Sequence, residues 1–423
     1  MTRAIRAVSV AAIALSTIAL TVTTASSAPS PATERVTVSA TGEQSNGASG
    51  APGLSADGRY AAFSTNGSNL VPGDTNGTSD SFLRDLRTGT VERVSVASDG
   101  TQGDGSVGGT DISGNGRYVI FSSSSTNLVD WPGPSEARGS DVYVHDRRTG
   151  RTERVSTTPD GGSAGAYGSF GISHDGRYVA FNAPRARMEA GQASYHLGAY
   201  LADRRTGEVK LISTHDNPEW TVYSVRLSGN GRSVAYDIRH PRGGRSELRV
   251  HDRVTGAEEQ ANVNQYGDPS SSPVTGTDLS YDGRTIAFST LDEGLTDDTT
   301  PATSYVFVRD LRTDTTRRVD NPEKGERALS AVSLSPDGRY VAYDYSVPVP
   351  GGEYGNNVFV YDLRTGATRL ATESLSGGKV TEDYSAPGAF SGNGRLLALV
   401  STSPQLVPDD TNGHSDGFVR RLR

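Results

Sequence analysis

A ten-residue pattern that recurs seven times is the feature that most limits how this 423-residue chain can fold. The first copy, LSADGRYAAF, begins at Leu54, and the last, FSGNGRLLAL, begins at Phe390. The serines of the copies cover 336 residues in six intervals, a mean period of 56 residues. A fixed period of this length indicates one supersecondary unit repeated in space. The repeat serines are Ser55, Ser113, Ser173, Ser228, Ser280, Ser335 and Ser391.

Each period has the sequence rhythm of four short strands. Apolar residues alternate with a period of two in segments such as 118–122, and no stretch sustains a helical period. A Gly-rich strand A precedes the repeat serine, strand B is the RYVAF-type segment, strand C resembles NVFVYD, and strand D follows an R-T-G turn. These units predict an all-β fold, a seven-bladed β-propeller of four-stranded antiparallel blades with strand A innermost.

The repeated polar residues fit two tight turns. In S-x-D/N-G-R the Asp or Asn can bond back to the backbone and the Gly supplies positive φ, which favours a hairpin between strands A and B. Segments of the form D-x-R-T-G predict the hairpin between strands C and D, and begin at Asp85, Asp146, Asp203 and Asp362. Turn chemistry explains these residues without a catalytic role.

The two ends of the chain are complementary. The seventh unit ends after its strand C, whereas residues 33–39 match the strand D that begins near Val91 and have no strands A to C before them. We therefore expect the N-terminal strand to complete the last blade, which removes the open edge of a linear array.

The segment LSPDGRYVAYDYS, followed by NNVFVYDLRTGATRLA, resembles the WD40-like (PD40-type) repeat of the TolB-like propellers. The resemblance covers all seven units. It implies a propeller that binds partner proteins or, in some branches, forms the entry domain of a peptidase or a polysaccharide-lyase site. No separate α/β domain precedes the repeats, so only the propeller architecture carries over from TolB.

The first residues indicate export. Arg3 and Arg6 precede an apolar run followed by small residues, which predicts a signal peptide over 1–28 and a single propeller over 29–423. We expect a secreted protein, extracellular or associated with the cell envelope, that is not inserted in a membrane and is a monomer. The chain has no cysteine, and its net charge of −8 and pI near 5.5 argue against a nucleic-acid partner.

Two segments match catalytic motifs only by their letters. GGSAG at 161–165 fits G-x-S-x-G, and GDGSVG at 103–108 fits G-x-G-x-x-G, but neither is followed by the required helix. The seven histidines contain no H-x-H or H-x-x-x-H pair. We name no catalytic residue and expect a non-enzyme rather than an enzyme.

Two B–C loops, LVPGDTNGTSDSF and LVPDDTNGHSDGF, belong to the first and last units, which are neighbours in a closed ring. Their closely spaced carboxylates and amides are ligands that Ca²⁺ accepts, although no bidentate Glu follows. The alternative is an Asx turn that caps strand C. The candidate calcium ligands are Asp74, Asn76, Asp80, Asp410, Asn412 and Asp416.

Strand A offers charged residues just before its last apolar residue. Asp111, Arg226 and Asp278 take this position in three units. They can face the central channel and bind a polar ligand or ion, or they can pair between neighbouring blades.

The B–C and D–A loops are long and unlike one another, and an up-and-down blade places them on one face. Binding residues concentrate on such loops. The candidate ligand-binding residues of this loop face are Trp131, Tyr195, His196, Trp220, Tyr354 and Tyr384. The first hypothesis is a secreted binding or scaffold propeller that recognises a protein, peptide or glycan. The alternative is an extracellular polysaccharide lyase or hydrolase at the channel mouth, which requires a converging acid/base cluster that the sequence does not reveal.

Overall fold

The computed structural model describes residues 32–130, 139–166, 168–189, 196–213, 219–240, 242–297, 304–319, 327–348, 354–381 and 384–422. These belong to the compact unit Ala32–Arg423, and the predicted signal peptide lies outside them. No helix among the described residues is long and apolar enough to cross a membrane.

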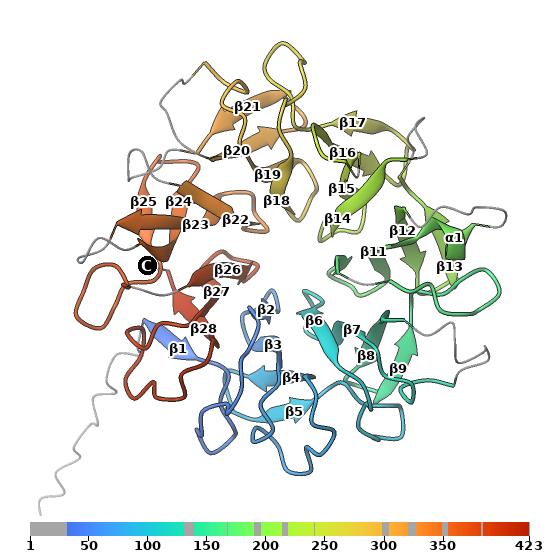
Figure 1. The fold of residues 1–423 in the computed structure, drawn as a ribbon, viewed down its shortest axis with the longest axis vertical. Coiled ribbons are helices and arrows are strands. Elements are labelled where there is room, and N and C mark those ends of the chain that lie inside the picture. The colour runs from blue at the N-terminus through green and yellow to red at the C-terminus, as the bar shows by residue number, and fades with distance from the viewer. Residues whose placement is uncertain are drawn as a thin grey trace, which may run out of the picture. The chain divides into compact units, whose positions relative to one another are not determined.

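Seven four-stranded antiparallel sheets surround a common centre, so the predicted fold class is confirmed (Figure 1). Blade 1 contains β2 (Gly53–Leu54), β3 (Tyr60–Thr65), β4 (Asp80–Asp85) and β5 (Val91–Arg93). Blade 2 contains β6 (Val107–Ile112), β7 (Tyr118–Ser123), β8 (Asp141–Asp146) and β9 (Arg151–Arg154). Blade 3 contains β10 (Phe170–Ile172), β11 (Tyr178–Pro184), β12 (Leu197–Asp203) and β13 (Glu208–Leu211), with the short helix α1 (Arg185–Met188) after β11.

The remaining blades follow the same order of strands. Blade 4 contains β14 (Thr221–Leu227), β15 (Ser233–Arg239), β16 (Ser246–Asp252) and β17 (Glu258–Gln260). Blade 5 contains β18 (Val274–Leu279), β19 (Thr285–Thr290), β20 (Tyr305–Asp310) and β21 (Thr315–Arg318). Blade 6 contains β22 (Arg327–Leu334), β23 (Tyr340–Pro348), β24 (Tyr354–Asp362) and β25 (Thr368–Leu370). Blade 7 contains β26 (Ser385–Phe390), β27 (Leu396–Ser401), β28 (Asp416–Arg421) and β1 (Thr33–Arg35).

The ring closes as the sequence predicts, because the N-terminal strand β1 pairs with the C-terminal strand β28. Glu34 lies opposite Val419 in this antiparallel pair, and the Val36 N–H extends it with a 2.8 Å bond to the Gly417 carbonyl. The regular pairing is shorter than the predicted 33–39. Figure 1 shows the blue β1 beside the red strands of the last blade.

The repeat motif builds the predicted A–B hairpin. In blade 1 the Ser55 hydroxyl donates to the Asp57 carboxylate at 2.6 Å and accepts a bond from the Tyr60 N–H at 3.0 Å. Gly58 has a φ of 68°, which an L side chain rarely adopts. The serine pairs with the Asp or Asn two residues later in every blade.

The A–B turns also bond to each other around the ring. The Ala56 N–H donates to the Gly114 carbonyl at 2.8 Å, and the His174 N–H donates to the Gly229 carbonyl at 2.7 Å.

The A–B and C–D turns share one face, because the repeat arginine Arg59 reaches the turn residue Asp85. We call this surface the turn face, and the opposite surface the loop face.

The hydrophobic core lies within and between the blades. A buried aromatic on strand B stacks on one from strand C, as Phe63 does on Phe82 at 6.0 Å and Phe288 on Phe307 at 5.7 Å. Clusters such as the one that contains Val36, Phe63 and Val419 join neighbouring blades. The D–A connections also run along the rim, where the hydroxyl of Thr152 in blade 2 donates to the Val96 carbonyl of blade 1.

Candidate functional site: the central channel

The innermost strands enclose a channel with two hollows that share part of their lining. A hollow of about 630 Å³ opens toward the turn face, and one of about 370 Å³ opens toward the loop face. Asp111 and Asp278 line both, and Arg226 lines the second. The three strand-A residues therefore face the channel, as one of the two predicted alternatives requires.

Arg226 and Asp278 also pair between neighbouring blades, which is the second predicted alternative. The Arg226 guanidinium of blade 4 donates to the Thr277 carbonyl of blade 5 at 3.1 Å. The Asp278 carboxylate of blade 5 accepts bonds from the Leu334 N–H of blade 6 at 2.8 Å and from the Ser333 hydroxyl at 3.3 Å. Their side chains hold three consecutive blades together at the channel wall.

Asp111 differs from its two neighbours. Its carboxylate accepts a hydrogen bond from the N–H of the next residue, Ile112, at 2.7 Å, and no described residue of another blade bonds to it. Burial in the channel raises the pKa of Asp111 to about 6, and the charge of Asp278 adds to this effect. Asp111 is therefore the carboxyl group of the channel that is most available to a ligand.

The turn-side mouth carries two residues that the sequence analysis did not select. His174 and Tyr281 line the larger hollow, and their rings meet edge to face at 5.7 Å. Both stand at the x of S-x-D/N-G-R, the one position of the turn that varies between Ala, Gly, His, Tyr and Pro. The variability of this position is the sequence signal that could have identified His174 and Tyr281 as candidate site residues. The turn face therefore carries variable side chains at the channel mouth in addition to its repeated turn residues.

The predicted loop-face residues do not all fall on described parts of the chain. Trp131 and Tyr195 lie outside the described residues, and the side chain of Tyr354 is not described. Tyr384 is about half exposed beside β26, where burial and the Asp344 carboxylate raise its pKa. Neither Tyr384 nor His196 lines the two hollows.

The loop-face ends of blades 3 and 4 form a separate polar cluster. Trp220 packs at the edge of the core cluster that joins these blades, and the adjacent Glu219 carboxylate lies 2.8 Å from the His240 ring. His240 lowers the pKa of Glu219, and His196 contributes to this effect. Trp220 and His196 are therefore brought near each other, away from the channel.

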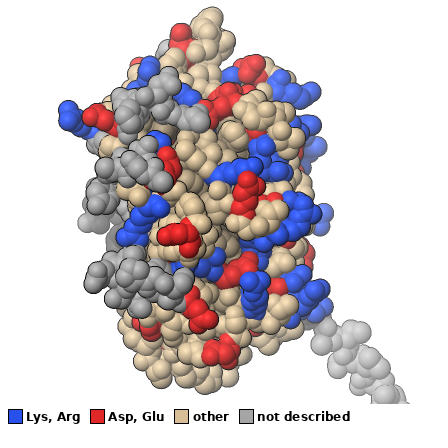
Figure 2. All heavy atoms as spheres, turned by 90° about the vertical axis from the view of Figure 1, so that its right-hand side faces the viewer, with Lys and Arg blue, Asp and Glu red and all other residues tan. Residues whose placement is uncertain are grey.

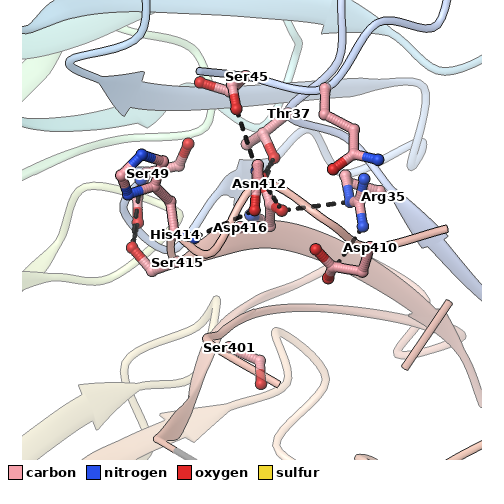
Figure 3. A network of polar contacts seen from close by, with 12 residues as sticks. Arg35, Thr37, Ser45, Ser49, Ser401, Asp410, Asn412, His414, Ser415 and Asp416 are labelled. Carbon is pink, nitrogen blue, oxygen red and sulfur yellow. Dashed lines mark hydrogen bonds and ion pairs between the residues drawn. The ribbon is translucent and has the colours of Figure 1, made fainter. Parts of the chain in front are cut away.

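The last B–C loop surrounds an arginine of the N-terminal strand (Figure 3). Arg35 lies 2.9 Å from the Asp410 carboxylate and 3.3 Å from that of Asp416. Asp416 also accepts bonds from the Thr37 hydroxyl at 2.5 Å and the Asn412 amide at 2.9 Å. This network ties the two ends of the chain together.

The first B–C loop repeats the arrangement within blade 1. Arg93 lies 3.7 Å from the Asp74 carboxylate and 3.5 Å from that of Asp80, and the Gln102 amide donates to both. Asn76 accepts a bond from the N–H of Thr78 two residues later, as an Asx turn does. Asn412 accepts the same bond in the last loop. The Asx-turn alternative is present in both loops, and a guanidinium faces each pair of carboxylates.

A chelator tests the calcium prediction directly. No group of three or more His, Cys, Asp or Glu among the described residues could hold a metal. Because Arg35 and Arg93 already supply positive charge to these carboxylates, we expect identical melting curves with and without EDTA. A lower melting temperature in EDTA that Asp74→Ala removes would assign a bound cation to the loops.

Comparison with known proteins places the chain by its fold. No family model matches the sequence, and no curated protein matches it. An oligogalacturonate lyase in complex with manganese aligns with a TM-score of 0.57 at 12% identity, over 92% of this chain and 93% of the lyase. The β-propeller domain of the Trilobed protease from Pyrococcus furiosus aligns with a TM-score of 0.53 at 10% identity, over 88% of this chain and 95% of that domain.

TolB from Acinetobacter baumannii aligns with a TM-score of 0.42 at 15% identity, over 87% of this chain and 81% of TolB. At these identities the similarities are similarities of fold alone. The propeller of the Trilobed protease is described as having an open velcro topology, whereas here β1 and β28 close the ring.

Proposed function

We propose that this chain is a non-catalytic binding propeller whose protein, peptide or glycan ligand approaches from the loop face and reaches Asp111 in the channel. The observation that carries the proposal is the loop-side hollow, which has charged walls supplied by three different blades. Because Arg226 and Asp278 are held by bonds to neighbouring blades, the hollow is preformed, and a ligand loses little free energy in ordering it.

Asp111 sets the chemistry of the ligand. A carboxylate in this hollow favours a group that donates hydrogen bonds, such as an amine or a hydroxyl, and Phe170, Leu227 and Pro387 offer apolar contacts to the segment that carries this group. The predicted signal peptide supports action outside the cytoplasm. We further propose that the chain acts as a monomer. An enzyme would need a second acid or base beside Asp111 that is free of structural bonds, and Asp278 is committed to blade 6.

The substitution Asp111→Asn tests this proposal. Ligands found on arrays of peptides and neutral glycans are expected to bind the variant roughly 10- to 100-fold more weakly, because a charge-assisted hydrogen bond contributes about 1.5–3 kcal/mol. The affinity of the unaltered chain should fall as the pH drops below about 6, where Asp111 gains a proton, and the variant should lack this dependence.

Asp99→Asn, at an exposed hairpin tip, is the matched control and should bind like the unaltered chain. If Asp111→Asn binds every array ligand with unchanged affinity and unchanged pH dependence, the channel is not the binding site.

A further inference from the structure

The turn face repeats an ion pair from blade to blade. The arginine of S-x-D/N-G-R reaches the Asp that ends strand C, with shortest N–O distances from 2.5 to 2.7 Å. The bond from Arg59 lowers the pKa of Asp85 to about 2. The pairs are Arg59–Asp85, Arg117–Asp146, Arg177–Asp203, Arg232–Asp252 and Arg339–Asp362.

Blade 7 reverses the charge of this position. Leu396 lies opposite Arg421 in the sheet, as Tyr60 lies opposite Asp85 in blade 1, so Arg421 stands where other blades place the Asp. The repeat arginine of this blade, Arg395, has no ion pair with any described residue, and it is exposed. Two arginines, Arg395 and Arg421, therefore stand where five other blades pair an arginine with an aspartate.

The same seam lacks a second arginine on its tyrosine: Arg339 lies over Tyr340 at 4.7 Å from the ring centroid, but the following blade supplies no arginine to this ring. At three other seams the residue after the turn Asp lies over the strand-B tyrosine of the preceding blade, at 4.1 to 4.4 Å from the ring centroid. The pairs are Arg147–Tyr60, Arg204–Tyr118 and Arg253–Tyr178. Between blades 6 and 7 the tyrosine is Tyr340 and the equivalent residue is Leu422, whose N–H bonds to the Arg395 carbonyl at 2.8 Å.

A hollow of about 460 Å³ lies at this seam and is lined by Tyr340, Leu422, Arg339, Arg369 and Arg395. Arg339 is bonded to Asp362, which also lines the hollow. The Asp337 carboxylate accepts bonds from its own turn. Arg369 is exposed and has no ion pair with a described residue. The A–B turns of blades 6 and 7 also lack the backbone bond that joins described turns elsewhere in the ring.

We infer that the seam between blades 6 and 7 on the turn face is a second binding site, which takes an acidic sugar unit of a polysaccharide. A carboxylate or sulfate of the sugar would replace the missing Asp beside Arg395 and Arg369, since guanidinium groups bind such anions through paired hydrogen bonds. The sugar ring would pack on Tyr340 and Leu422, in the space that a guanidinium fills at other seams. A volume of 460 Å³ lies within the range of small-ligand pockets.

The surrounding surface favours a polymer of such units. The C–D turns present exposed arginines without an ion pair to a described residue, namely Arg87, Arg148, Arg205, Arg312 and Arg364. Figure 2 shows Lys and Arg gathered along its right-hand edge. The net charge of −8 is thus unevenly distributed and does not exclude an anionic partner. Single-stranded nucleic acid is less suited, because it needs several aromatic side chains for stacking and the hollow supplies one tyrosine.

Calorimetric titration with a uronic-acid tetrasaccharide tests the inference. Arg395→Ala and Arg369→Ala are each expected to weaken binding roughly 10-fold or more. Arg284→Ala is the matched control, because Arg284 is the exposed repeat arginine of blade 5 and does not bond to its turn residue Asp310. This control should bind like the unaltered chain.

A second variant keeps the result independent of folding defects. The double substitution Arg421→Asp and Leu422→Arg gives Arg395 an aspartate partner and gives Tyr340 a stacking arginine from blade 7, as at other seams. This variant should melt no lower than the unaltered chain, and it should lose tetrasaccharide binding. Unchanged binding by this variant would overturn the site. Equal affinity for a neutral tetrasaccharide or for inorganic sulfate alone would overturn the assignment to an acidic sugar, as would tighter binding of single-stranded DNA.

Discussion

A chain that begins at Gly42 is expected to melt well below one that begins at Ala32, and to aggregate. It lacks β1, so the outer edge of β28 loses its partner and becomes a template for pairing with other chains. It also lacks Val36 and Val38, which are buried in the intact chain. Each buried valine contributes about 1.5–3 kcal/mol to the free energy of unfolding before the backbone pairing is counted.

Thermal unfolding and size-exclusion chromatography of the two chains measure this effect. The chain from Ala32 is the control, because it keeps the described N-terminal strand and removes only residues before it. Equal melting temperatures and equal elution as a single species would show that the pairing of β1 with β28 does not hold the ring closed.

The strands and turns could be predicted because each depends on residues close to it in the sequence. The hydroxyl of Ser55, the carboxylate of Asp57 and the positive φ of Gly58 act within one hairpin, and the sequence repeats them seven times. Ring closure was also predictable, because residues 33–39 match another strand D and therefore require a blade that lacks one.

The contacts between blades could not be predicted in the same way. Arg147 stacks on Tyr60, and a side chain on Gly176 would meet the Tyr118 ring at 2.1 Å. These partners are about one or more repeat periods apart, and only the closed ring shows which positions face each other. The glycine of the turn motif therefore has two roles: it adopts a positive φ, and it packs closely against the preceding blade. Only the positive φ could be predicted from the turn pattern.

The candidate site was predicted in part. The position of Asp111, Arg226 and Asp278 on strand A predicted the channel wall as one of two alternatives, and all three line the loop-side hollow. It could not separate Asp111 from the other two, because that difference depends on the backbone groups that the next blade presents. His174 and Tyr281 were missed because the turn motif was treated as scaffold, although its variable residue faces the channel mouth.

The substitution Arg35→Met is expected to lower the free energy of unfolding by about 3–5 kcal/mol, the usual effect of removing one partner from a buried ion pair. It leaves the Asp410 and Asp416 side chains, which are 7% and 0% exposed, without their cation. Burial already raises the pKa of Asp416, and loss of Arg35 raises it further. A folded-state pKa above the unfolded value destabilises the protein as the pH rises, so the loss should be larger at pH 8 than at pH 5.

Arg93→Met is the matched variant, because Arg93 faces Asp74 and Asp80 in the equivalent network of blade 1. Both variants should lose similar equilibrium stability in denaturant titrations. Of the two arginines, Arg35 is the one that joins the two ends of the chain, so Arg35→Met and not Arg93→Met should increase hydrogen exchange in β28 and β1 under native conditions, through local opening of blade 7. If the two variants show the same exchange in these strands, the strand pairing itself holds the ring closed and the arginine network adds nothing specific to closure.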